Sequence, residues 1–372
     1  MATVSRKVCR VPLVVGALLV ASSSLAAQPA PRASSAVVLI TIDGLRWQEV
    51  FTGADSALVS RKEGGVPDTA RLRRDYWRSS ADERRRALLP FVWGTIAARG
   101  TIWGNVAAGS DAHVTNGLKF SYPGYNEMLT GAPDPQIDKN GFGPNPNVTV
   151  FEALSKRPGL TDRVAAFGSW EVFANIFNRK RAHFPVHVAY DKPPGAKPGT
   201  PERPIDRVYR TTTRPWDDGM SFDAFMQALV IDWVKTRKPR VLFVGFGESD
   251  EWAHDKRYDL VLRSAHDVDG YIAELWNTMQ RMPEYRGAVT FIVTTDHGRG
   301  VGAEWTDHGK DVAGAEQVWI AMIGPGAPTL GEAKGGPAIT QAQIAATVAA
   351  MVGEDWRALS PKAAPSLARI RR

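Results

Sequence analysis

Residues 288–298 read Ala-Val-Thr-Phe-Ile-Val-Thr-Thr-Asp-His-Gly, and this stretch decides the predicted fold. An apolar run rich in strand-forming residues ends in two metal-ligand types, Asp296 and His297, followed by a glycine turn. Open α/β sheets place their chemistry at the carboxyl ends of their strands, so we expect both side chains at such an edge. The stretch therefore predicts a central strand that carries part of a functional site.

Two further apolar runs end in a comparable way. The run 37–42 leads to Asp43, and the run 241–247 leads to Asp250. His254 follows Asp250 by four residues, so a helical turn there would place both side chains on one face. A carboxylate and an imidazole would then be available to one ion.

A third element, His308 in Asp-His-Gly, completes a set of carboxylates and imidazoles sufficient for two divalent ions. Mixed nitrogen and oxygen ligands favour zinc, although manganese or another divalent ion would accept the same carboxylates. A single Asp-His pair at a strand end is more often a capping aspartate beside a surface histidine. Several such elements in one chain are harder to explain by chance, and we predict a hydrolase that binds two zinc ions.

The candidate nucleophile is Ser121, in a segment that reads as a loop running into a short helix. The positive end of a helix favours an anion, and a hydroxyl bound to zinc loses its proton near neutral pH. Ser121 could therefore attack without a histidine base. The alternative is that Ser121 only caps the helix. A Ser-His-Asp hydrolase has less support, because the chain lacks a Gly-x-Ser-x-Gly segment.

Strand-type and helix-type runs alternate from residue 37 onward, which predicts an α/β fold with a mostly parallel sheet. We expect one catalytic domain over residues 37–355. Two segments are predicted to be insertions. Residues 52–90 are charged and helix-prone, and residues 191–216 are rich in proline and read as an irregular surface loop.

The amino terminus has the pattern of a signal peptide over residues 1–26. Three basic residues precede the apolar run 11–21, which is too short to span a bilayer, and small residues follow at 24–26. The only cysteine, Cys9, lies inside this segment, so the mature chain would contain no disulfide. We expect a periplasmic or secreted protein with no stable membrane insertion.

The composition is that of an ordinary globular protein, with 44% hydrophobic and 23% charged residues. The formal net charge of +7 weakly favours an anionic substrate. Nothing in the charge pattern indicates nucleic-acid binding, and the oligomeric state is left open.

These motifs, in this order, resemble the alkaline phosphatase superfamily over about residues 37–351. The resemblance implies an α/β/α sandwich, a site that usually holds two zinc ions, and attack by Ser121 on phosphorus through a phosphoserine intermediate. By motif match, one ion would be held by Asp43, Ser121, Asp296 and His297, and the other by Asp250, His254 and His308. Sulfatases of similar architecture need an arginine where this chain has Tyr125, which argues against sulfatase activity as the main reaction.

Three further residues resemble the substrate-binding positions of the superfamily. Asn145, with Asn147 as an alternative, resembles an asparagine that contacts a non-bridging phosphate oxygen. Arg179 and Arg181 stand where one group of periplasmic phosphatases has a phosphate clamp, although both also fit a plain basic loop. A bidentate arginine suits a terminal phosphoryl group and so favours monoesters.

The leading hypothesis is an exported phosphomonoesterase that acts on small organic phosphates. The first alternative is a phosphodiesterase or nucleotide pyrophosphatase that uses the same metals and nucleophile. The second is a non-catalytic metal-binding protein that keeps the fold.

Overall fold

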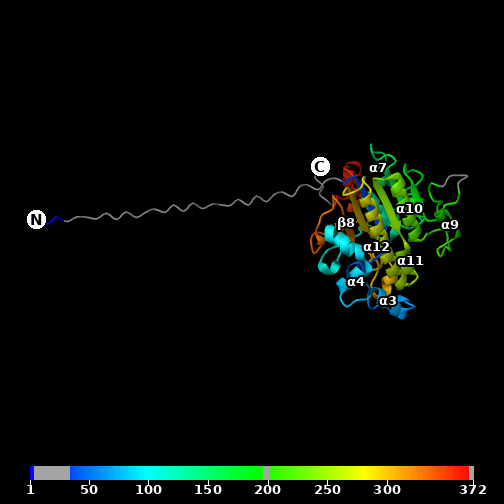
Figure 1. The fold of residues 1–372 in the computed structure, drawn as a ribbon, viewed down its shortest axis with the longest axis horizontal. Coiled ribbons are helices and arrows are strands. Elements are labelled where there is room, and N and C mark those ends of the chain that lie inside the picture. Colours follow the sequence, from blue (N-terminus) through cyan, green and yellow to red (C-terminus); the bar gives the residue numbers. More distant parts are fainter. Residues whose placement is uncertain (4–33, 196–200, 368–372) are drawn as a thin grey trace. The chain divides into compact units, whose positions relative to one another are not determined.

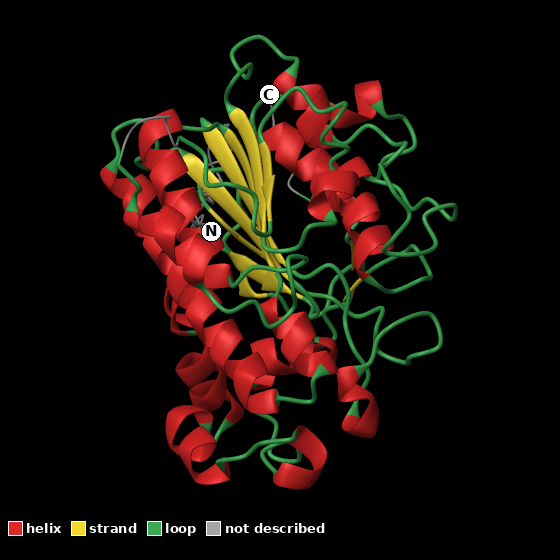
Figure 2. Cartoon of the chain, turned by 90° about the vertical axis from the view of Figure 1, so that its right-hand side faces the viewer, coloured by secondary structure: helices red, strands yellow, loops and turns green. Residues whose placement is uncertain are grey.

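The computed structural model describes residues 1–3, 34–195 and 201–367. Its centre is an eight-stranded sheet in the order β5-β4-β6-β1-β7-β8-β2-β9, with helices on both faces (Figure 2). The strands of this sheet are β1 (Ala36–Ile42), β2 (Thr101–Trp103), β4 (Val164–Gly168), β5 (Val186–Val188), β6 (Val241–Phe246), β7 (Val289–Thr294), β8 (Ile320–Ile323) and β9 (Gly331–Glu332). A second sheet pairs β3 (Ala112–His113) with β10 (Ile339–Thr340).

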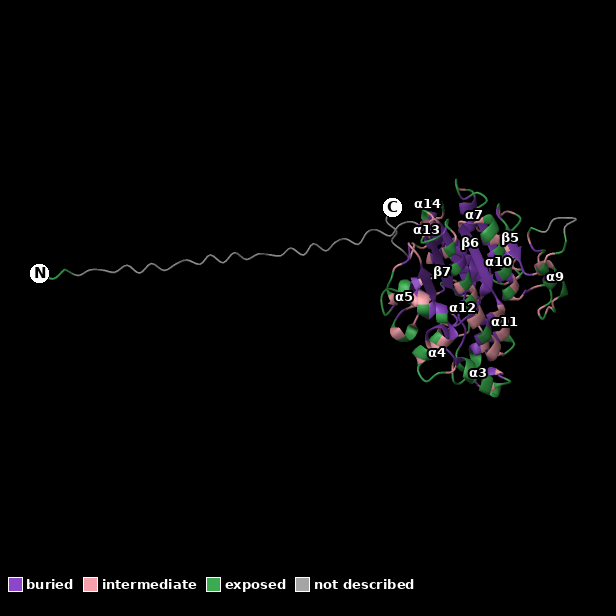
Figure 3. Ribbon diagram, viewed as in Figure 1, coloured by how far each residue is buried: buried purple, intermediate pink, exposed green. Residues whose placement is uncertain are grey.

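The five strands from β5 to β7 all run parallel, whereas β8 is antiparallel to β7 and to β2. Every residue of β1, β6 and β7 is buried (Figure 3). Helices cover both faces of such strands, which is why their sequences are continuous hydrophobic runs without a polar side. The predicted α/β fold with a mostly parallel sheet is confirmed.

Two hydrophobic cores lie on opposite faces of this sheet. Val38 and Ile40 of β1 contribute to the first core, and Val37 and Leu39 to the second, as the alternation of a strand requires. The helices of the first core include α1 (Trp47–Thr52), α3 (Thr69–Tyr76), α4 (Ala81–Leu88), η1 (Val92–Ile96), α9 (Pro204–Thr211), α10 (Asp223–Arg237), α11 (Glu248–His254), α12 (Tyr258–Arg281) and η3 (Gly302–Thr306). Several of them are labelled in Figure 1.

The second core is covered by a different set of helices, and the sheet is therefore the middle layer of a sandwich. These helices are α6 (Ser121–Thr130), α7 (Val150–Ser155), α8 (Phe173–Ile176), α13 (Gln343–Met351) and α14 (Trp356–Leu359). The short helices α2 (Arg61–Gly64), α5 (Ala97–Arg99) and η2 (Val106–Ala108) complete those of the described residues.

Two predicted segments differ from the structure in their details. The sequence pattern predicts a helix over 267–282, and in the structure this helix, α12, begins earlier, at Tyr258, because its buried stripe already includes Val261 and Leu262. The segment 191–216, predicted to be irregular, contains α9. Proline fits the first helical position, where its missing N–H has no intrahelical partner in any case, and Pro204 starts α9 in this way.

The predicted signal peptide, residues 1–26, lies outside the described residues except for residues 1–3. Within the described ranges, no helix is both long enough and apolar enough to cross a bilayer.

Candidate metal centre

The carboxyl ends of three adjacent strands bring the predicted ligands together. Ile42 of β1 pairs with Phe246 of β6, and the Asp43 N–H continues this pairing by donating to the Phe246 carbonyl at 2.9 Å. On the other side of β1, β7 ends just before Asp296 and His297. These motifs therefore meet at one edge of the sheet, as the sequence predicted.

The first group of ligand atoms comes from Asp43, Asp250 and His297, whose ligand atoms lie within 4.8 Å of one another. The His297 Nε2 atom is 3.4 Å from Asp43 Oδ1 and 3.7 Å from Asp250 Oδ1. Asp296 Oδ2 lies 3.6 Å from the same nitrogen. The hydroxyl of Ser121 is also close, with its Oγ 3.3 Å from His297 Nε2.

The second group consists of Asp250, His254 and His308. The Nε2 atoms of His254 and His308 face each other at 3.0 Å, and Asp250 Oδ2 lies 3.2 Å from His254 Nε2. Three residues predicted to share one ion are thus adjacent. Asp250 contributes to both groups, however, whereas the motif match assigned it to the second ion alone.

The orientation of His297 suits a ligand that binds through Nε2. Its Nδ1 atom lies 2.9 Å from the Gly298 carbonyl, which can only accept, so Nδ1 carries a proton and donates. The lone pair of the neutral ring is then on Nε2, toward Asp43 and Ser121. Metal-binding histidines commonly have their tautomer fixed in this way.

The electrostatics of the site favour a bound cation. Burial, together with the charges of Asp296 and Asp250, raises the pKa of Asp43 well above its usual value. Burial opposes a charge on His297, yet the neighbouring carboxylates outweigh it and raise its pKa to about 9. Asp43 Oδ1 and Asp296 Oδ2 are buried and accept no hydrogen bond. Buried charged oxygens of this kind are stable only when paired or bound to a metal, so the residues fit divalent ions.

Ser121 is the first residue of α6, a helix buried along its whole length. The N-cap position belongs to Phe120, so Ser121 does not cap the helix. Gly124 allows α6 to approach the strand end, because a Cβ atom there would lie 2.4 Å from the Asp296 carbonyl oxygen. The helix therefore presents the Ser121 hydroxyl to His297 Nε2, which itself lies 3.4 Å from Asp43 Oδ1.

Tyr125 and Asn140 also contact this region, although no motif indicated a role for them there. The Tyr125 hydroxyl donates to Asp43 Oδ2 at 3.0 Å, and Asn140 Oδ1 accepts from the Tyr122 N–H at 3.0 Å. Tyr125 was predictable, because residues four apart on a helix share a face and Ser121 was already a candidate. Asn140 gave no signal, since its contact depends on how a loop folds over α6.

Asn145 has its polar atoms engaged with residues other than the predicted metal ligands. It is fully buried, and its Nδ2 atom donates at 3.2 Å both to Asn126 Oδ1 and to the Ile176 carbonyl. Its Oδ1 atom accepts from the Asn147 N–H at 2.9 Å. The predicted contact of Asn145 with a phosphate oxygen remains a prediction, and it would require at least one of these bonds to break.

The two arginines of the predicted clamp are engaged in ion pairs. Arg179 Nη1 lies 2.8 Å from Asp191 Oδ2, and Arg181 Nε lies 2.9 Å from Glu152 Oε2. Arg181 also donates to the carbonyls of residues 146 and 147. These partners are distant in sequence, which is why the basic run alone did not reveal them.

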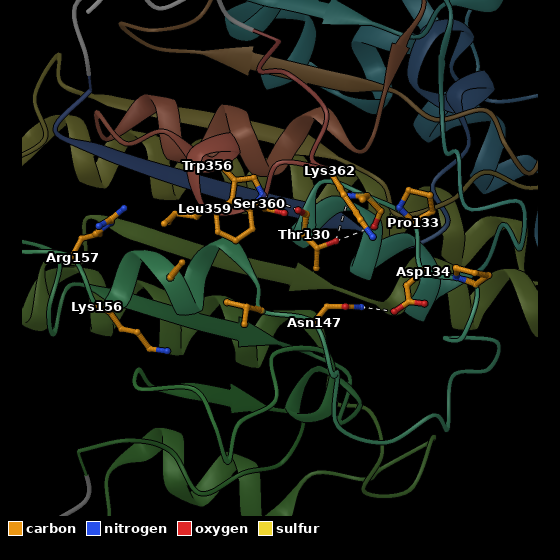
Figure 4. Close-up of a pocket in the computed structure, with 14 residues that line it drawn as sticks. Thr130, Pro133, Asp134, Asn147, Lys156, Arg157, Trp356, Leu359, Ser360 and Lys362 are labelled. Carbon is orange, nitrogen blue, oxygen red and sulfur yellow. Dashed lines mark hydrogen bonds between the residues drawn. The ribbon is translucent and has the colours of Figure 1, made fainter.

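A separate cavity of about 670 Å³ lies at the carboxyl-terminal end of α6 (Figure 4). Thr130, the last residue of α6, lines it together with Trp356 and Lys362. None of the predicted metal ligands contributes to its wall.

Comparisons with known proteins establish the class of fold. The sequence matches no protein-family model, and it matches no curated protein. Its structure is similar to a mutant of alkaline phosphatase PafA, with a TM-score of 0.54, 10% identity, and coverage of 90% of this chain and 98% of that chain. It is also similar to inactive murine ectonucleotide pyrophosphatase/phosphodiesterase 5 in complex with AMP, with a TM-score of 0.51, 13% identity and coverage of 90% and 97%.

A third similar structure is a 2-O GAG sulfatase, with a TM-score of 0.52, 13% identity and coverage of 90% of this chain and 73% of that chain. The resemblance to the alkaline phosphatase superfamily is therefore confirmed at the level of the fold. These neighbours include a phosphatase, a phosphodiesterase and a sulfatase by name, so the fold alone does not select among their reactions.

Proposed function

We propose that this protein is a metal-dependent phosphomonoesterase that forms a phosphoserine intermediate on Ser121. One observation carries the proposal. The Ser121 hydroxyl, at the first position of α6, lies 3.3 Å from His297 Nε2, within a cluster of carboxylates and imidazoles whose innermost members, Asp43, Asp296 and His297, are buried. Such a cluster beside a hydroxyl is suited to phosphoryl transfer, which depends mainly on positioning and on charge stabilisation.

Two ions would be held by the groups described above, with Asp250 next to both. When bound, they would supply the positive charge that stabilises the transition state and favours the ionised form of the Ser121 hydroxyl. The donor set favours zinc, with manganese or another divalent ion as the alternative.

Ser121 Oγ would attack phosphorus in line with the ester oxygen. One P–O bond forms to the serine as the bond to the alcohol breaks, and the alcohol leaves with a proton. Water then attacks the phosphoserine, which releases inorganic phosphate and restores the serine hydroxyl. The positive end of α6 would favour the anionic phosphoryl group throughout.

A phosphodiesterase is the second candidate, and the ion pairs of Arg179 and Arg181 favour it. A monoester carries one more negative charge than a diester and gains more from a free guanidinium. If both arginines stay paired, the preference for monoesters must come from the ions alone.

The test compares p-nitrophenyl phosphate with bis-p-nitrophenyl phosphate on the purified mature protein, with its metal content determined. We expect two ions per chain, faster turnover of the monoester, loss of activity with a chelator and recovery with zinc. A diester preference would favour the second candidate. Bound metals without turnover of either ester would favour a binding protein.

Arg181→Ala tests the predicted clamp separately. Because Arg181 is bound to Glu152, we expect the ratio of monoester to diester turnover to change by less than about twofold. Glu152 is 1% exposed and would keep only Lys156 as an ionic partner, so the free energy of unfolding should fall by about 1 kcal/mol. Arg179→Ala tests the second residue of the predicted clamp in the same assay. A tenfold loss on the monoester, without a loss on the diester, in either variant would instead establish a clamp.

A further inference from the structure

Arg299 is a buried arginine beside the second group of ligands, and the proposed reaction gives it no part. It is 2% exposed and follows His297 by two residues. Its Nη2 atom donates to Asp250 Oδ1 and, at 3.2 Å, to the Asp250 carbonyl, while Nη1 donates to the Thr306 carbonyl. Thr306 ends η3, two residues before His308. The Arg299 guanidinium thus forms hydrogen bonds to both segments that carry ligands of the second group, at Asp250 and at Thr306.

The two carboxylate oxygens of Asp250 consequently have different partners. Oδ1 accepts from Arg299, whereas Oδ2 lies 3.2 Å from His254 Nε2. A carboxylate held at one oxygen and at its own backbone cannot turn freely. Its second oxygen is therefore directed at His254, whereas His308 Nε2 lies 3.8 Å from Oδ1.

The end of β1 leaves room for this contact. Gly44 has φ +58°, and a Cβ atom there would lie 2.6 Å from Asp250 Oδ1 and 2.8 Å from Arg299 Nε. Any side chain at this position would strain the backbone and press on both partners. The Asp43-Gly44 pair therefore supplies a ligand and, next to it, the space that Arg299 and Asp250 occupy.

We propose that Arg299 is a positioning residue that directs Asp250 Oδ2 toward the ion shared with His254 and His308, and that it sets the affinity for that ion. This inference rests on the proposed two-metal function. The guanidinium also repels a dication, but its charge is offset by Asp250. Without it, Asp250 would be free to rotate and the carbonyls of Asp250 and Thr306 would lose their donor.

The test measures Zn²⁺ affinity of the mature protein by competition with a zinc-binding dye. In Arg299→Met, we expect the ion of the second group to bind about 10- to 100-fold less tightly, as happens when an outer partner of a ligand is lost. The other ion should be retained. With Co²⁺ in place of zinc, the visible absorption of the second ion should change in intensity, a readout independent of turnover.

Two other variants separate positioning from general stability. Arg299→Lys keeps the charge but cannot hold Asp250 and Thr306 together, so we expect part of the affinity to return. Arg46→Met removes a second buried arginine, which donates to the Gly300 carbonyl at 3.2 Å and pairs with Glu49. We expect Arg46→Met to lower the melting temperature while both ions bind as in the wild type.

Unchanged or tighter binding of the second ion in Arg299→Met would overturn the positioning role, as would an equal loss of affinity in Arg46→Met. If Arg299→Met does not fold, zinc affinity is compared in Arg299→Lys instead. Unchanged or tighter binding of the second ion in that variant would then overturn the positioning role. Wild-type protein that binds neither zinc nor another divalent ion such as manganese would refute the proposed function and this inference together. Two ions in the wild type and unchanged affinities in both Arg299 variants would refute the inference only.

Discussion

Ser121→Ala should lower turnover of p-nitrophenyl phosphate by at least about a thousand-fold, because it removes the proposed nucleophile of a covalent mechanism. The same variant should still bind two ions. Ser121 contributes one oxygen near the first group, whereas the carboxylates and imidazoles around it remain in place. This variant is therefore expected to lose turnover while it keeps its metal content.

Rapid quenching and mass spectrometry provide a direct measurement. Wild-type protein mixed with substrate should carry one phosphoryl group on the peptide that contains Ser121, and Ser121→Ala should carry none. Ser155→Ala is the matched control, since Ser155 is a buried helical serine whose hydroxyl donates to the Glu152 carbonyl. Wild-type turnover in Ser121→Ala would show that another group attacks phosphorus.

The strand ends were the part of the site that the sequence could predict. Asp43 and Asp296 follow apolar runs that become central parallel strands, and such strands end at a common edge. Asp250 and His254 were paired by helical spacing, which α11 bears out. In each of these cases, local periodicity determined where the side chain points.

Contacts between distant segments could not be predicted in the same way. The position of Asp250 in both ligand groups depends on how α11 docks against the ends of β1 and β7. Arg299 looked like one more basic residue in a glycine-rich segment, and only the folded chain places it on Asp250. The antiparallel direction of β8 could not be predicted either, because a short apolar run has the same pattern in a parallel and in an antiparallel strand.

Asp250→Ala should have a larger effect on metal binding than the loss of any other single ligand. Asp250 belongs to both groups, whereas His254 and His308 belong only to the second. We therefore expect His254→Ala to keep about one ion per chain and Asp250→Ala to keep less than one, since each lost ligand removes much of the affinity of its ion. Elemental analysis after dialysis against a weak chelator measures this difference.

The same substitution should destabilise the metal-free protein, because it leaves the buried Arg299 guanidinium without its carboxylate. Breaking one side of a buried ion pair costs about 3–5 kcal/mol. Asp250→Asn keeps an acceptor for Arg299, so it should lose metal like Asp250→Ala but unfold at a higher temperature in excess chelator. Two tightly held ions in Asp250→Ala would refute the shared position of Asp250. Equal metal-free stability of the two variants would show that Arg299 does not depend on Asp250, and the guanidinium would then have to be satisfied by carbonyl oxygens such as that of Thr306.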